Sequence, residues 1–290
     1  MKKLLVLTRF PGEYEPRRLA AAARERGVAA RIVNYEEVGL GWGTGKTEIF
    51  LPRSEKAEDF DGVVLRSGGH HKKESLSALK TALVKVWPQS AAVLNRESFE
   101  KWPIIGKTEQ GVMLAREGTA VIPSWFLASR EEKEAFLKTA EYPLIIKGRF
   151  GSHSQKTFRA EKNDEARQFL AQAGDFFIQK LVKSRFYWRV MVLGGKVLGA
   201  MKRETNDRLL AAGENWEISE GELGRLALAA AAVFKAQMAG VDILATGPEK
   251  GAVIEVNRSP QFEIFERRLG IRVAEEVIGF LTERQNGGQA

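Results

Sequence analysis

The sequence contains no cysteine among its 290 residues. This absence excludes structural disulfides, thiolate metal sites, cysteine nucleophiles and regulation by thiol oxidation. It is typical of a protein from a reducing compartment, so we expect a cytoplasmic location. The hydrophobic content of 44% is ordinary for a globular protein and allows a sizeable core without covalent staples.

The chain also lacks a long hydrophobic run. Its best candidate, Leu226–Val233, is followed by Lys235 and is far shorter than the roughly 20 apolar residues that span a bilayer. The N-terminal lysines resemble those of a signal peptide, but the apolar segment Leu4–Leu7 after them is too short for one. We therefore expect a soluble protein with no membrane partner.

The charge is unbalanced but not concentrated. The formal net charge is +8, with lysine and arginine interleaved with glutamate and aspartate along the whole chain. Nucleic acid, an anionic surface and an acidic substrate are all attracted by such a field. Without a basic tail or patch, nucleic-acid binding is the less favoured reading, and an anionic small molecule or acidic peptide fits better.

The first hundred residues alternate between short apolar segments and amphipathic ones. This alternation predicts a parallel sheet covered by helices. Gly39–Gly45, with four glycines and Trp42, is read as a mobile loop. The predicted strands are Lys3–Leu7, Ala30–Val33, Gly62–Leu65 and Ala92–Leu94, and the predicted helices are Pro16–Arg26, Ser75–Trp87 and Arg96–Trp102.

The remainder predicts a strand–loop–helix–strand unit followed by a hairpin and a strand pair. The Gly194-Gly195 turn marks the hairpin, and a polar loop is expected over 202–215. A disordered tail is expected over 285–290. The predicted strands are Leu144–Ile146, Phe176–Gln179, Trp188–Leu193, Lys196–Met201, Val241–Leu244 and Ala252–Val256, and the predicted helices are Lys107–Glu117, Arg130–Thr139, Asp164–Ala173, Glu220–Met238 and Val273–Arg284.

Carboxylates inside two adjacent apolar strands are the clearest chemical signal. Asp242 lies in a Val-Asp-Ile-Leu segment, and Glu255 lies in a Val-Ile-Glu-Val-Asn segment that ends at Asn257. Strand side chains alternate between faces, so Glu255 and Asn257 point the same way, and strand pairing can bring Asp242 beside them. Such an all-oxygen set favours Mg²⁺, which keeps water and phosphate oxygens as its remaining ligands. The alternative is a buried network in which the two carboxylates pair with Arg203, Arg208 or Arg258.

These segments resemble the metal-binding end of the ATP-grasp fold, particularly its RimK-like carboxylate–amine ligases. The resemblance rests on Gly240–Leu244 and on Val253–Pro260, and it extends backwards in the family's order through nearly the whole chain. It implies an α/β protein of three parts: an N-terminal parallel-sheet subdomain (1–104), a central lid subdomain (105–182) and a C-terminal antiparallel-sheet subdomain (183–290). The earlier segments that match are Leu94–Arg96, Lys107 with the following helix, Pro143–Lys147, Phe177–Gln179 and Arg189.

The resemblance implies ATP and Mg²⁺, or Mn²⁺, as cofactors. Lys107 and Lys147 would reach the phosphates from two sides; the less favoured alternatives are a solvated helix face for Lys107 and an edge lysine for Lys147. Gly148–Lys156, with Ser152 and Ser154 as donors, would cover the phosphates. Around adenine and ribose the resemblance places Gln179, Lys180, Leu181, Val182 and Tyr187, of which Lys180 and Tyr187 stand where relatives have acidic residues.

The implied reaction joins a carboxylate to an amine through an acyl phosphate. Arg189 and Arg203 are the candidates for stabilising the transferred phosphate or a substrate carboxylate, and salt-bridge roles are equally open. The expected substrates are an amino acid such as glutamate and an acidic peptide or small acid. Homo-oligomers are common in the family. The alternative is an inactive ATP-grasp module that binds a nucleotide or partner, which Lys180, Tyr187 and the unusual 208–215 segment favour.

The adjacent His70 and His71 are not read as a metal site. Neighbouring strand residues face opposite ways, and the sequence shows no third ligand. A substrate-facing loop over Arg66–His71 is the preferred reading.

Overall fold

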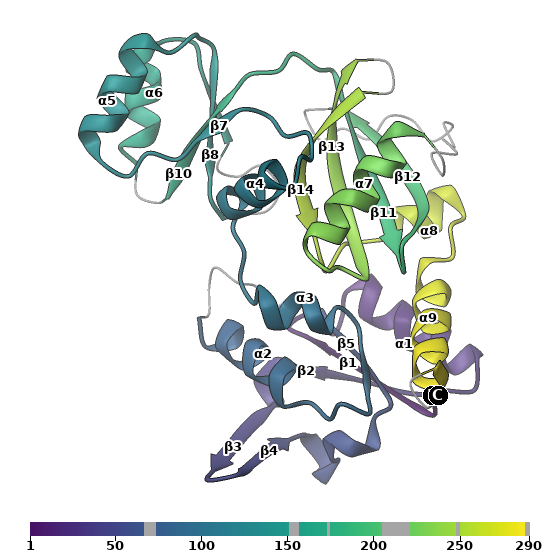
Figure 1. The fold of residues 1–290 in the computed structure, drawn as a ribbon. Coiled ribbons are helices and arrows are strands. Elements are labelled where there is room, and N and C mark those ends of the chain that lie inside the picture. The colour runs from purple at the N-terminus through teal and green to yellow at the C-terminus, as the bar shows by residue number, and fades with distance from the viewer. Residues whose placement is uncertain (67–73, 151–156, 173–174, 205–220, 248–249, 288–290) are drawn as a thin grey trace.

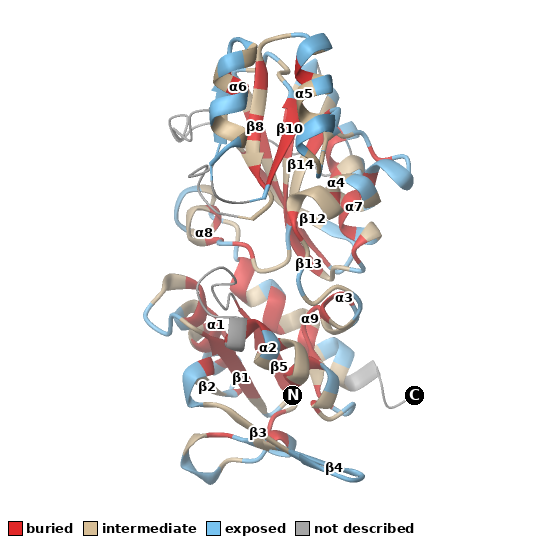
Figure 2. Ribbon diagram, turned by 90° about the vertical axis from the view of Figure 1, so that its left-hand side faces the viewer, coloured by how far each residue is buried: buried red, intermediate tan, exposed pale blue. Residues whose placement is uncertain are grey.

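A computed structural model gives the arrangement of residues 1–66, 74–150, 157–172, 175–204, 221–247 and 250–287 (Figure 1). Within these residues the chain forms three four-stranded sheets and a two-stranded hairpin. Figure 2 shows that buried residues follow the strands of each sheet, whereas the outer surfaces of the helices are exposed.

The N-terminal sheet is parallel, as predicted, with strand order β2-β1-β5-β6. Its two faces belong to different cores: Leu5 and Leu7 pack with one, and Leu4 and Val6 with the other. Because β1 is buried on both faces, Leu4–Leu7 is continuously apolar and does not alternate between apolar and polar residues. The elements are β1 (Lys3–Thr8), α1 (Tyr14–Glu25), β2 (Ala29–Asn34), β5 (Gly62–Leu65), α2 (Glu74–Val86), β6 (Ala92–Val93) and α3 (Arg96–Lys101).

The predicted mobile loop at Gly39–Gly45 is wrong. The segment forms the first strand and turn of an antiparallel hairpin, β3 (Gly39–Gly43) and β4 (Lys46–Phe50), at the far end of the N-terminal unit (Figure 1). Gly45 has φ of 71°, which supplies the left-handed turn residue, while Trp42 is 84% exposed. The glycines thus serve a turn and a strand. Short 3₁₀ helices flank the hairpin at Tyr35–Glu37, Pro52–Ser54 and Ala57–Asp59.

A second, antiparallel sheet with order β7-β10-β8-β9 forms the central unit. Its own core includes Leu144, Ile146 and Ile178 beneath two helices. The predicted order of strand, helix and strand is confirmed, with the additional strand β9, and residues 151–156 of the predicted loop lie outside the described residues. The elements are β7 (Ser124–Trp125), α5 (Arg130–Thr139), β8 (Leu144–Gly148), β9 (Thr157–Ala160), α6 (Asn163–Leu170) and β10 (Phe176–Lys180). Helix α4 (Lys107–Arg116), which precedes them, packs instead against β14 and α7.

The C-terminal sheet is antiparallel with order β12-β11-β13-β14, and α7 (Glu222–Val233) covers one of its faces (Figure 1). The strands are β11 (Phe186–Leu193), β12 (Lys196–Glu204), β13 (Met238–Gly247) and β14 (Lys250–Asn257). Two sequence predictions are wrong here. Lys202–Glu204 belongs to β12 and not to a loop, and the long helix ends at Val233, because Lys235 has φ of 50° and Met238 already pairs in β13.

The last helix returns to the N-terminal unit. After α8 (Glu263–Leu269), which the sequence did not predict, α9 (Val273–Gly287) packs against α1 and the strands β5 and β6. Val277 and Ile278 share one core with Leu4 and Leu19. The first and last parts of the chain are therefore one packed body. The helix includes residues 285–287 of the predicted disordered tail, and the rest of that tail lies outside the described residues. Among the described helices, none is both long and apolar enough to cross a membrane.

Gly251, at the start of β14, provides a stability prediction. A Cβ there would lie 2.3 Å from Ile243 Cγ2 and 2.9 Å from Leu223 Cδ2, so Gly251→Ala overpacks the contact between sheet and α7. We expect it to lower the free energy of unfolding by about 1–3 kcal/mol, measured by urea denaturation. Gly247→Ala is the matched control, because its nearest contact would be an ordinary 3.7 Å. Equal stabilities of the two variants would contradict the expectation.

Candidate active site

The strand register brings the predicted carboxylates together. Asp242 on β13 is the cross-strand partner of Glu255 on β14 and, on its other side, of Arg189 on β11. Cross-strand partners project from the same face of a sheet. The opposite face carries Val190, Val241 and other apolar residues that pack under α7. The charged residues therefore line the face that α7 leaves uncovered.

Asp242 forms an ion pair with Arg189. Nε and Nη2 of Arg189 donate to the two carboxylate oxygens of Asp242, each at 2.7 Å. Burial alone would lower the pKa of Arg189, but the hydrogen bonds and charge of Asp242 outweigh it and raise that pKa above its usual range. The alternative raised from the sequence paired the carboxylates with Arg203, Arg208 or Arg258. Arg189 takes this role instead, and Arg208 lies outside the described residues.

Glu255 lies beside a lysine from another part of the fold. Lys107 Nζ, at the N-terminus of α4, is 3.5 Å from Glu255 Oε2. Burial raises the pKa of Glu255, and the nearby Asp242 raises it further, while Lys107 and Arg189 oppose the shift. Asn257 is two residues beyond Glu255 on the same strand, and its Oδ1 accepts a hydrogen bond from the Ser259 amide at 2.9 Å.

Lys147 reaches the same site from the central sheet. Its Nζ donates to Gln179 Oε1 at 2.7 Å, and Gln179 Nε2 donates in turn to Ser124 Oγ at 2.9 Å. Burial, helped by the positive charge of Lys107 and opposed by Glu255, lowers the pKa of Lys147 to about 8. Sequence reasoning placed Gln179 beside adenine. In the structure its side chain orients Lys147.

An ion pair and a backbone hydrogen bond join the end of β8 to α4. Arg149 pairs with Glu109, its Nε lying 3.1 Å from Oε2, and Arg149 O accepts a hydrogen bond from the Lys107 amide at 2.9 Å. Neither Arg149 nor Glu109 was predicted as a site residue. The signal was their position, since each follows a candidate lysine, Lys107 or Lys147, by two residues.

The same face of the sheet continues into an apolar cluster. Tyr187 is buried against Ile122, Leu244 and Ala252, with Val182 and Ile254 packed at its edge. Arg203, opposite Tyr187 in the register, lies with its guanidinium carbon 5.9 Å from the Tyr187 ring centroid, and its buried Nε has no hydrogen-bond partner among the described residues. Arg203 is thus close to this cluster and has an unused donor.

The other residues that were predicted to bind the nucleotide occupy different environments. The Lys180 amide donates to Pro123 O at 2.9 Å, so it is not available to a nucleobase, and its side chain lies 3.5 Å from Glu141 at the surface. Leu181 and Val182 connect β10 to β11 and are half-buried. Ser152 and Ser154, like His70 and His71, lie outside the described residues.

The oxygen donors fit a magnesium ion. Asp242 and Glu255 supply carboxylate oxygens on one face, and Asn257 adds an amide oxygen two residues further along. A carboxylate oxygen that accepts a bond from arginine keeps a further lone pair. Among the described residues, no group of three histidine, cysteine or acidic side chains could hold a metal by itself. Magnesium suits a sparse set like this one, because it usually retains waters and phosphate oxygens.

Comparisons with known families and proteins identify related domains over most of the chain. Residues 106–281 match the model of the RimK-like ATP-grasp domain, and residues 2–91 match the RimK pre-ATP-grasp domain. A probable alpha-L-glutamate ligase from Halorhodospira halophila is 28% identical over 302 residues, covering 99% of this chain and 97% of the relative. One from Alkalilimnicola ehrlichii is 26% identical over 299 residues, with the same coverage.

A solved structure of the ATP-grasp ligase PsnB, complexed with a phosphomimetic variant of a minimal precursor, Mg and ADP, has the same fold. Its TM-score is 0.74 at 22% identity, and 99% of each chain is covered. The fold and the matched domain models together define the class of ATP-grasp ligases. Within that class, the chain belongs to the RimK-like ATP-grasp family, whose domain model matches more than half of its length.

Proposed function

We propose that the protein uses Mg²⁺ and ATP to join a carboxylate to an amine, with an acyl phosphate as intermediate. The observation that carries the proposal is the facing pair Asp242 and Glu255, with Lys107 3.5 Å from Glu255 and Lys147 near enough for the charges of Glu255 and Lys107 to shift its pKa. Two lysines beside a pair of carboxylates suit a site for phosphates and a metal ion. An inactive binding module is the less favoured reading, because the relatives are named as ligases.

In this proposal Lys107 and Lys147 bind the phosphates of ATP, and Asp242, Glu255 and Asn257 hold the metal. When bound, Mg²⁺ neutralises phosphate charge and orients the terminal phosphate. Gln179 keeps Lys147 directed at the site through the 2.7 Å hydrogen bond. The nucleobase would lie against Leu181 and Val182, the half-buried residues between β10 and β11 where the resemblance places adenine.

The reaction then has two steps. A carboxylate oxygen of the acid substrate attacks the terminal phosphorus, and the bond to the leaving ADP oxygen breaks. The amine next attacks the carbonyl carbon, the bond to phosphate breaks, and the amine loses a proton. Arg203, whose buried Nε has no acceptor in the described part of the chain, would donate to the transferred phosphate or the carbonyl oxygen. Arg189 would orient Asp242 through its paired hydrogen bonds.

The proposed amine is an amino acid such as glutamate, and the proposed acid is a peptide or small acid. The names of the relatives support glutamate. A structural neighbour, PsnB, is described as complexed with a precursor peptide. The net charge of +8 suits an anionic substrate.

A screen tests this function. Purified protein with ATP and Mg²⁺ is incubated with amino acids and carboxylates in pairs, and ADP release and product mass are followed. The expected result is ADP formation only with a matching pair, together with a product heavier by the amino acid minus water. A complete screen, including peptides, without any ATP-dependent amide would refute the proposal.

The lowered pKa of Lys147 predicts a pH dependence of nucleotide binding. A lysine is a cation below its pKa, so raising the pH through about 8 removes a phosphate-binding charge. We expect the affinity for a nonhydrolysable ATP analogue to fall by about tenfold between about pH 7 and about pH 9.5, measured by calorimetry. Lys147→Arg should flatten the profile, because guanidinium stays charged. The same decline in both proteins would assign the titration to another group.

A further inference from the structure

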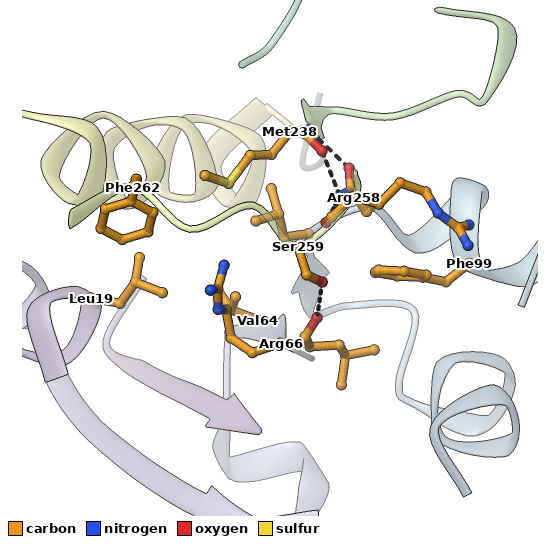
Figure 3. A pocket seen from close by; sticks show the side chains of 11 residues that line it. Leu19, Val64, Arg66, Phe99, Met238, Arg258, Ser259 and Phe262 are labelled. Atoms are coloured by element: carbon orange, nitrogen blue, oxygen red, sulfur yellow. Dashed lines mark hydrogen bonds between the residues drawn. The ribbon is translucent and has the colours of Figure 1, made fainter. Parts of the chain in front are cut away.

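The strand that carries Glu255 is fixed at its end to the N-terminal unit. Arg66 Nη1 donates to Pro260 O at 2.7 Å, and Ser259 Oγ donates to Leu65 O at 3.3 Å. Figure 3 shows Arg66 and Ser259 at this contact. Because both acceptors are backbone carbonyl groups, the contact gives the end of β14 a defined position relative to the N-terminal sheet.

Helix α4 is attached to the same strand. Gln110, which is 6% exposed, accepts a hydrogen bond from the Val256 amide through its Oε1 at 2.8 Å. Lys107 lies three residues earlier, at the start of the helix, and its Nζ is 3.5 Å from Glu255 Oε2. Lys107 therefore belongs to one arrangement with β14 and the N-terminal unit.

Lys147 belongs to the central sheet and needs separate links to this arrangement. In Figure 1, α4 lies between the central sheet and β14. The segment that leads into β7 forms one link, because Val121 bridges to Val253 and the Val253 amide donates to Ala120 O at 2.8 Å. Arg149, two residues beyond Lys147, forms a second link.

Arg149 contacts the first turn of α4 in three ways. Its guanidinium binds both carboxylate oxygens of Glu109, with Nε 3.1 Å from Oε2. Its carbonyl oxygen accepts a hydrogen bond from the Lys107 amide at 2.9 Å. Its aliphatic stem lies over Gly106, where a Cβ would be 2.8 Å from Arg149 Cγ. The missing side chain at Gly106 thus allows the end of β8 to approach the helix closely.

Asp175 holds Arg149 to the central sheet. The Arg149 amide donates to Asp175 O at 2.8 Å, and Arg149 Nη1 lies 3.5 Å from Asp175 Oδ2. Asp175 directly precedes β10, the strand from which Gln179 accepts the hydrogen bond of Lys147. A partly exposed ion pair contributes little to stability. A bidentate pair with backbone hydrogen bonds on both sides, in contrast, fixes geometry.

We propose that Arg149 and Glu109 are positioning residues that set the separation of Lys107 and Lys147 before the nucleotide binds. This inference rests on the phosphate-binding role of the two lysines in the proposed function. Two like charges repel, so the lysines would separate if the link were lost. A nucleotide bound by both would then have to bring them together, which lowers its affinity.

Arg149→Met and Glu109→Gln test the proposal against direct phosphate binding by Arg149. We expect each variant to weaken the binding of a nonhydrolysable ATP analogue with Mg²⁺ by about 5- to 20-fold, measured by calorimetry. If Arg149 itself bound the phosphates, Glu109→Gln would free its guanidinium and remove a nearby negative charge, so the affinity would rise. Unchanged or higher affinity in Glu109→Gln would overturn the proposal.

Arg167→Met is the matched control. Arg167 also pairs with two carboxylates, Glu134 at 2.6 Å and Asp164 at 3.7 Å, and its side chain is 42% exposed against 32% for Arg149. It joins α5 to α6 within the central unit and makes no link to α4. We expect this variant to bind the analogue as the wild type does. A loss equal to that of Arg149→Met would contradict a specific role for Arg149.

A double-mutant cycle separates positioning from a general loss of structure. In a Lys147→Met background, no second lysine remains to be placed. Arg149→Met should then weaken binding by less than about twofold, because substitutions that act through the same group are not additive. An equal loss in the wild-type and Lys147→Met backgrounds would overturn the proposal.

The outcomes separate this inference from the proposed function. Nucleotide binding that follows these expectations without any amide product would keep the positioning role and refute the ligase function. Amide formation with unchanged nucleotide affinity in Glu109→Gln would keep the ligase function and remove the positioning role. A wild-type protein that does not bind the analogue would refute both.

Discussion

Glu255→Gln is expected to reduce the Mg²⁺-dependent part of nucleotide binding, and any ADP release, by about 100-fold or more. The amide keeps the shape of the side chain but removes the charge that faces Asp242 and Lys107. Burial already raises the pKa of Glu255, so its neutral form is compatible with the fold. Calorimetric titration of an ATP analogue with and without Mg²⁺ measures the effect independently of substrate identity.

Glu48→Gln is the matched control for this variant. Glu48 is exposed on the β3–β4 hairpin, remote from the C-terminal sheet in Figure 1, so we expect no change in nucleotide binding. Thermal unfolding of both variants should resemble that of the wild type. Metal-dependent binding retained in Glu255→Gln would place the metal elsewhere.

Arg189→Met is expected to lower the free energy of unfolding by about 2–4 kcal/mol. The substitution leaves Asp242, whose side chain is only 13% exposed, without the guanidinium that donates to both of its oxygens. A carboxylate left in this position without its cation is strongly destabilising. Urea denaturation of the ligand-free protein measures the loss.

The double variant Arg189→Met/Asp242→Asn should recover part of that loss, because it removes the uncompensated charge as well. Mg²⁺ offers a second control: at high concentration it should stabilise Arg189→Met more than the wild type, since the bare carboxylate gains a cation. Equal stabilities of Arg189→Met and the wild type would mean that the ion pair is dispensable for the fold.

Much of the fold followed from pattern. The apolar segments of the first hundred residues predicted a parallel sheet, and residues as different in position as Leu5 and Val63 are buried in it. The wrong predictions fall where the local residue composition of a segment disagrees with its strand pairing in the fold. Gly39–Gly43 was read as a loop from its glycines, but pairing with β4 overrides that weak local preference. The alanine-rich helix was extended past Val233, where pairing of β13 with β11 takes over.

The site was only partly readable in the same way. Alternation along a strand placed Glu255 and Asn257 on one face, and the structure agrees. Sequence reasoning could not find the partner of Asp242, because Arg189 is 53 residues away and becomes its neighbour only when β13 inserts beside β11. The hydrogen bonds that run from Lys147 through Gln179 to Ser124 likewise join three strands of the central sheet.

The sequence by itself determined which chemical groups the protein has, because residue type fixes the oxygens of Asp242, Glu255 and Asn257, and strand alternation fixes the face that Glu255 and Asn257 share. Only the tertiary structure decided which charged side chains contact one another. Strand order pairs Arg189 with Asp242, the docking of α4 brings Lys107 to Glu255, and the turn after β14 meets the N-terminal sheet at Arg66. These contacts join distant segments, and no local pattern encodes the distance between residues that meet only when the sheets pack.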